Sequence, residues 1–180
     1  DAVAWWLTEK YSSMFESCRN KAGLTQKMRS VMPSVTPVCF GSMYSGVMPS
    51  VHGIQKYEKP VLKVETLFDD YVKAGKKAAI VSTVGDSISK IFLERNIDYY
   101  IYPSCAHVNS CAKKLIKKNK YDLIVIYNGN YDLNMHHHGP ESKQALKALK
   151  KNIKTFTGIV DLIEKYMPED NVLFGFCPDH

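Results

Sequence analysis

Residues 122–140 read DLIVIYNGNYDLNMHHHGP, and their pattern indicates the fold class. It begins with an apolar run at 122–128 that is rich in β-branched residues and has the length of one strand. A polar segment follows, and Pro140 then suits the first turn of a helix. A buried strand that leads through a polar loop into a helix is the repeating unit of α/β proteins.

Further strands and helices are predicted throughout the chain. The apolar runs are continuous rather than alternating, as in strands that are covered on both faces. We therefore expect an α/β three-layer sandwich, with a mostly parallel central sheet and helices on both faces. The remaining strands are predicted at 78–84, 98–102 and 171–176, and the helices at 37–45, 62–74, 86–95, 107–118 and 140–166.

The composition is that of one globular domain over residues 1–180. The chain is 45% hydrophobic and 23% charged, which excludes a disordered protein. No apolar run approaches the roughly 18 residues of a membrane span. A net charge of +6 favours anionic ligands, but the lysines have few aromatic or arginine neighbours, so a nucleic-acid partner is not expected.

The five cysteines predict free thiols. Their number is odd and their spacing is not that of a disulfide scaffold. Cys39 and Cys177 lie in apolar segments, where we expect them to be buried. Free thiols favour a reducing compartment, so a cytoplasmic location is expected.

Carboxylates and imidazoles follow two of the predicted strands. Asp132 and His136 come after the strand at 122–128, and Asp179 and His180 come after the strand at 171–176. The carboxyl ends of parallel strands are where functional groups of α/β proteins gather. These residue types are ligands for zinc or a similar divalent ion. The alternative for both segments is a polar, exposed turn.

Thr36 has two possible roles. With Pro37 behind it, it is expected to be the N-cap of the helix at 37–45, which ends at Gly46. A helix N-terminus also attracts anions, and a hydroxyl held there by a metal ion can act as a nucleophile. The two roles are compatible.

Together these segments resemble the alkaline phosphatase superfamily, and within it the type I phosphodiesterase/nucleotide pyrophosphatase branch. That branch has a nucleophilic threonine followed by a motif that appears here as SGVMPSVHGI at 45–54. The motifs DLNMHHHGP at 132–140 and PDH at 178–180 match its metal-binding segments. Asp1, in DAVAWW, matches its first metal-binding aspartate.

The resemblance implies a centre of two divalent metal ions, usually zinc. Asp132 and His136 would bind one ion, together with a further histidine expected beyond residue 180. The resemblance also implies a first strand before Asp1, so the chain is expected to be part of a longer protein. The ligands implied for the other ion are Asp1, Thr36, Asp179 and His180.

The implied reaction is the hydrolysis of a small anionic phosphate ester. Thr36 attacks phosphorus, the alcohol leaves, and water hydrolyses the phosphothreonine intermediate. Lys56 stands where nucleotide-cleaving members have an asparagine that binds a phosphate oxygen, so the likeness does not extend to a nucleotide substrate. Lysine can bind phosphate as a point charge, and Lys56 is the expected substrate-binding residue. His52 is interpreted as a packing residue.

Two other functions stay open on the sequence. The same ligands would serve a phosphomonoesterase or a phosphonoacetate hydrolase of the superfamily. A non-catalytic α/β module that binds anions is a third possibility. It would show no metal dependence and no effect of Thr36→Ala. Against it, the sequence contains neither a G-x-G-x-x-G motif nor a Walker loop.

Overall fold

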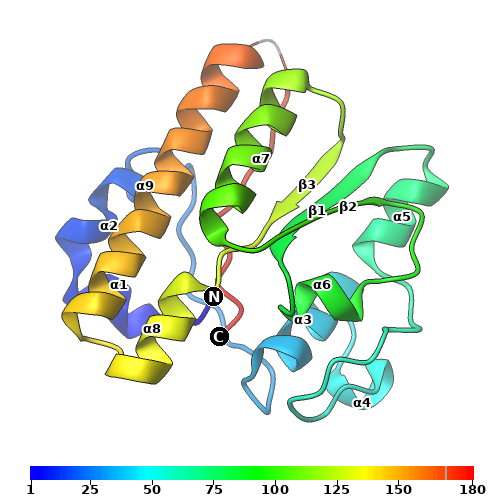
Figure 1. The fold of residues 1–180 in the computed structure, drawn as a ribbon, viewed down its shortest axis with the longest axis horizontal. Helices are drawn as coiled ribbons and strands as arrows, with labels where there is room; N and C mark the ends of the chain where they lie inside the picture. The colour runs from blue at the N-terminus through cyan, green and yellow to red at the C-terminus, as the bar shows by residue number, and fades with distance from the viewer. Residues whose placement is uncertain (169) are drawn as a thin grey trace.

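A computed structural model describes residues 1–168 and 170–180 of the chain (Figure 1). Three strands form one sheet, and helices surround it. The strands are β1 (Ala78–Thr83), β2 (Asp98–Tyr102) and β3 (Leu123–Ile126). The helices are α1 (Trp5–Lys10), α2 (Ser12–Arg19), α3 (Thr36–Ser45), α4 (Pro49–His52), α5 (Leu67–Lys73), α6 (Ile88–Ile91), α7 (Cys105–Lys118), α8 (Asn130–His138) and α9 (Lys143–Tyr166).

The sheet is parallel, as expected, with β1 between β2 and β3. In this register Val81 of β1 lies opposite Tyr100 of β2 and Ile126 of β3. The first five residues of β1 are buried, which is why this run is apolar throughout. All three strands therefore end at the same edge of the sheet, where the candidate site lies.

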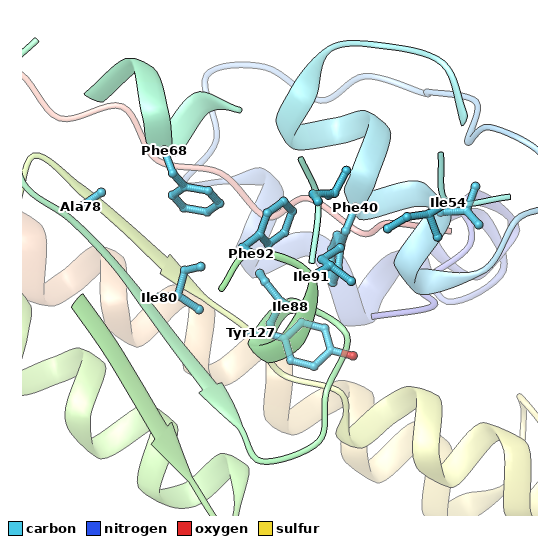
Figure 2. Packing of buried hydrophobic residues seen from close by; sticks show 11 residues of the cluster. Phe40, Ile54, Phe68, Ala78, Ile80, Ile88, Ile91, Phe92 and Tyr127 are labelled. Atoms are coloured by element: carbon cyan, nitrogen blue, oxygen red, sulfur yellow. The ribbon is translucent and has the colours of Figure 1, made fainter. Parts of the chain in front are cut away.

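Helices cover both faces of the sheet, so the expected three-layer arrangement is confirmed. Successive side chains of a strand point to opposite faces, and Ile80 and Val81 accordingly belong to different cores. Ile80 packs with Phe68, Phe92 and other residues of α3, α5 and α6 (Figure 2). On the other face, Val81 packs with residues of α7.

A further apolar cluster holds the helices beside the sheet. Leu7 of α1, Phe15 of α2, Tyr131 of α8 and Leu149 of α9 pack together and are buried. Because Tyr131 is completely buried in this cluster, α8 is fixed against α9 directly after β3. The cluster therefore sets the position of Asp132, the next residue of α8.

The prediction of a strand at 171–176 is wrong. This segment has irregular backbone, and instead of pairing with a strand it is held by its aromatic side chains. The ring of Phe174 stacks on Phe156 of α9 at 4.9 Å, and that of Phe176 meets Phe156 edge-on at 5.4 Å. An apolar, aromatic composition suits this packing as well as it suits a strand.

Several helices have bounds that differ from the predicted ones. The helix predicted at 62–74 begins at Leu67, because Thr66 and Asp69 form a capping box. It ends, as predicted, before Gly75, which adopts a φ of 71°. The helix predicted at 140–166 begins at Lys143, because the Ser142 side chain accepts a hydrogen bond from the Ala145 N–H. The helix predicted at 86–95 is reduced to α6, and the one at 107–118 begins at Cys105.

The five cysteines are free, as expected. Cys39 is buried, but Cys177 is exposed, which contradicts the prediction for that residue. Within the described residues, no helix is long and apolar enough to cross a membrane.

Candidate metal centre

Thr36 opens helix α3 but does not cap it. The N-cap is Val35, whose carbonyl accepts hydrogen bonds from Val38 and Cys39, each at 3.0 Å. The prediction of Thr36 as N-cap, with Pro37 at the first helical position, was therefore wrong by one residue. The consequence is chemical, because the hydroxyl of Thr36 is not used to cap the backbone. It lies 3.2 Å from Nε2 of His180 instead.

His52 packs against Gly41 and Ser42 of helix α3. The Ile54 N–H donates to Nδ1 of His52 at 3.2 Å, so Nε2 carries the ring proton and donates to Ser42 Oγ at 3.0 Å. Burial lowers the pKa of His52, which keeps the ring neutral. Its ring lies against Gly41, where any side chain would collide with it. These contacts confirm the interpretation of His52 as a packing residue.

The two described ends of the chain meet at the carboxyl edge of the sheet (Figure 1). Nε2 of His180 lies 3.4 Å from Oδ1 of Asp1 and 3.6 Å from Oδ2 of Asp179. The Ala2 N–H donates to the other oxygen of Asp179 at 3.3 Å, which ties the two ends together. Asp1, Thr36, Asp179 and His180, grouped by the resemblance, thus lie together in the structure.

The remaining two predicted ligands lie on a helix rather than in a loop. Asp132 and His136 are four residues apart on α8, and helix geometry places such residues on one face. Nε2 of His136 lies 3.2 Å from Oδ1 of Asp132. This distance is compatible with the expectation that both residues bind one ion, but the polar loop expected here was wrong.

Asp132 also lies close to residues from both described ends of the chain. Ligand atoms of Asp1, Asp132 and His180 all lie within 4.8 Å of one another. We call the six residues the acidic–histidine cluster; they are Asp1, Thr36, Asp132, His136, Asp179 and His180.

The cluster has the chemistry of a cation site. Oδ1 of Asp1, Oδ1 of Asp132 and Oδ2 of Asp179 are buried and have no hydrogen-bond partner among the described residues. Burying a carboxylate oxygen without a partner is costly, and a bound cation would remove that cost. Four tetrahedral ligands about 2.0–2.1 Å from zinc lie roughly 3.3 Å apart. The separations of 3.2–3.6 Å around His180 fit such a shell.

Lys56, the expected phosphate-binding residue, is not joined to the cluster by any contact among the described residues. Its side chain is 77% exposed, and its Nζ lies 3.4 Å from a carboxylate oxygen of Glu58. Its role in substrate binding stays a prediction. His137 and His138 are also exposed, with ring centroids 6.2 Å apart.

Sequence reasoning missed the residues that directly follow β3. The Tyr127 hydroxyl donates a hydrogen bond to Oδ2 of Asp1, and burial raises the pKa of this tyrosine. Asn128 and Asn130 each contribute a buried side-chain oxygen that has no hydrogen-bond partner in the described part of the chain. Their place at the carboxyl end of a parallel strand was the signal that could have found them.

A carboxylate-rich cation site beside a hydroxyl at a helix N-terminus can bind and activate a phosphate ester. Among protein-family models, that of the type I phosphodiesterase/nucleotide pyrophosphatase family matches residues 8–180 of the chain. A search of curated proteins found no match. The matched residues include five of the six members of the acidic–histidine cluster, and the contacts of Asp1 add the sixth.

Proposed function

Because the chain belongs to the type I phosphodiesterase/nucleotide pyrophosphatase family, a family of hydrolases, we propose that it cleaves phosphate diesters at a centre of two divalent metal ions, with Thr36 as nucleophile. The observation that carries this proposal is the environment of Nε2 of His180. Three oxygens, from Thr36, Asp1 and Asp179, lie 3.2–3.6 Å from one imidazole nitrogen.

The ligands would divide into two sets. Asp1, Thr36, Asp179 and His180 would hold one ion, and Asp132 and His136 the other. The set of carboxylates and imidazoles fits zinc best, since they are common zinc ligands. When bound, the ions would lower the pKa of the Thr36 hydroxyl and stabilise negative charge on the phosphoryl oxygens.

Thr36 is suited to the attack by its position. It is 6% exposed, and its backbone is fixed at the start of a ten-residue helix. An anionic substrate bound beside Thr36 would meet the positive end of the α3 dipole. In the proposed reaction the Thr36 hydroxyl gives up its proton and its oxygen forms a bond to phosphorus, while the bond to the leaving group breaks and the departing oxygen takes up a proton to become the alcohol. Water then hydrolyses the phosphothreonine, which restores the hydroxyl.

Turnover of two model esters tests this proposal. Hydrolysis of bis-p-nitrophenyl phosphate and of p-nitrophenyl phosphate is measured with added zinc for the wild type, Thr36→Ala and Thr36→Ser. We expect a preference for the diester, a loss of about a thousand-fold or more in kcat for Thr36→Ala, and partial activity for Thr36→Ser, which keeps a hydroxyl.

The outcomes separate the candidate functions. A preference for the monoester that is also lost in Thr36→Ala would keep the nucleophile and make the protein a phosphomonoesterase. Turnover that survives in Thr36→Ala would overturn Thr36 as nucleophile. No turnover of either ester would contradict the diesterase function and direct attention to phosphonates or to a binding role.

A further inference from the structure

Tyr127 connects the apolar core to the acidic–histidine cluster. It directly follows β3, and its N–H donates to the carbonyl of Val81 at 2.9 Å, which continues the parallel ladder by one residue. The ring packs edge-on against Phe40 of α3, with centroids 5.6 Å apart. Figure 2 shows this ring at the border of the core, with its hydroxyl oxygen pointing away from Ile88 and Phe92.

The hydroxyl of Tyr127 reaches Asp1 and engages only one of its carboxylate oxygens. Oδ2 of Asp1 accepts the hydrogen bond from Tyr127. Oδ1 is buried without a hydrogen-bond partner among the described residues and lies 3.4 Å from Nε2 of His180. The side chain of Asp1 is 2% exposed, so both of its oxygens are shielded from bulk solvent.

We propose that Tyr127 is a positioning residue of the metal centre, whose hydroxyl holds Oδ2 of Asp1 and thereby turns Oδ1 toward the metal ion. This inference rests on the metal centre of the proposed function. Partners of this kind, which orient a metal ligand without touching the metal, typically contribute 10- to 100-fold to metal affinity.

Asp179 is arranged in the same way, which supports this reading of Asp1. Its Oδ1 accepts a hydrogen bond from the Ala2 N–H at 3.3 Å, and its Oδ2 is buried and unpartnered among the described residues. Each of the two aspartates thus has one oxygen engaged by the protein and one turned toward His180. For Asp179 the donor is a backbone group, whereas for Asp1 it is a side chain that can be changed.

The test compares two Tyr→Phe variants from the same core. Tyr44 packs against Phe40 as Tyr127 does, at 6.0 Å, and its hydroxyl makes no hydrogen bond within the part of the chain that the structure describes. Zinc affinity of the metal-free intact protein is measured by competition with a chromophoric chelator. Tyr127→Phe is expected to weaken zinc binding about 10- to 100-fold, and Tyr44→Phe is expected to leave it unchanged.

A double-mutant cycle shows whether Tyr127 acts through Asp1. In an Asp1→Ala background the hydroxyl has no carboxylate to hold, so adding Tyr127→Phe is expected to cause no further loss of zinc affinity. Full additivity of the two losses would overturn the inference, as would equal zinc affinities of Tyr127→Phe and Tyr44→Phe. A wild type that binds no zinc would instead refute the metal centre of the proposed function.

Discussion

Three oxygens surround Nε2 of His180, and a single ring proton can satisfy only one of them. This is true of the neutral ring and of the charged ring, since each carries at most one hydrogen on Nε2. The oxygens of Asp1 and Asp179 would compete for that hydrogen, and both are buried. A cation among the four atoms satisfies all of them together, so the residue geometry favours a metal centre over a hydrogen-bonded cluster.

Residue 41 of α3 has to be glycine, because the ring of His52 lies directly against it. A Cβ at residue 41 would lie 2.6 Å from Cε1 of His52 and 2.9 Å from its Nδ1. Since His52 is buried and bonded through both nitrogens, it cannot move away freely. We predict that Gly41→Ala lowers the free energy of unfolding by about 1–3 kcal/mol, measured by urea denaturation.

The matched control is Gly158→Ala in helix α9. A Cβ there meets no atom within 4 Å, so the substitution keeps the helix and removes only the flexibility of glycine. It is expected to raise the free energy of unfolding by roughly 0.5–1 kcal/mol. Equal effects of the two substitutions would show that His52 does not hold α3 in place.

Helix α8 shows where sequence reasoning succeeded and where it did not. Asp132 and His136 were expected to act together, and Oδ1 of Asp132 lies 3.2 Å from Nε2 of His136, while their binding of a metal ion stays a prediction. The helix itself was missed, because Asn128, Gly129 and Asn130 have the composition of a turn. What makes this segment helical is tertiary packing, since Tyr131 is buried against α9.

The register of α8 leads to a prediction about its histidines. His136 lies one turn after Asp132, whereas His137 is rotated by roughly 100° around the helix axis. His136→Ala is expected to lower the amount of zinc bound per chain, because Asp132 loses its partner ligand. His137→Ala, the neighbouring control, is expected to leave it unchanged. The measurement is equilibrium dialysis with metal analysis, and equal losses in both variants would contradict the assignment of His136.

The segment 171–176 shows that composition alone does not establish a strand. Its composition predicted a strand, but the part of the chain that the structure describes contains no strand that pairs with it. In the described residues β3 pairs only with β1, and the segment packs on Phe156 instead of joining the sheet. A ladder needs a neighbouring strand in register, and the residues of the segment itself do not reveal whether one is present.

On the scale of the whole molecule, the site is assembled from four distant parts of the chain. Thr36 and His180 are 144 residues apart, and Tyr127 and Asp1 are 126 apart. The motifs identified which residues belong together, because their order and spacing follow the family. The motifs could not predict the hydrogen bond from Tyr127 to Asp1. This contact depends on how the segment that begins at Asp1 packs beside the end of β3.

Because the proposed ligands include residues from both described ends of the chain, metal binding is expected to stabilise the entire fold. Binding to the folded state alone adds about 2.7 kcal/mol when free zinc is 100 times the dissociation constant. We predict that zinc raises the thermal midpoint of the metal-free protein and that His180→Ala removes this increase. Differential scanning fluorimetry over a zinc titration measures it. An increase of equal size in His180→Ala would place the bound zinc elsewhere.

The proposed reaction requires Thr36 to carry the phosphoryl group during turnover. The most direct measurement is to quench the zinc-loaded protein with acid while it hydrolyses bis-p-nitrophenyl phosphate, and to map its peptides by mass spectrometry. We predict that the peptide containing Thr36 gains the mass of the phosphoryl group retained after the first alcohol leaves. The corresponding peptide of Thr36→Ala is expected to show no such gain. Continued turnover with an unmodified Thr36 peptide, under conditions in which hydrolysis of the intermediate is slow, would contradict it.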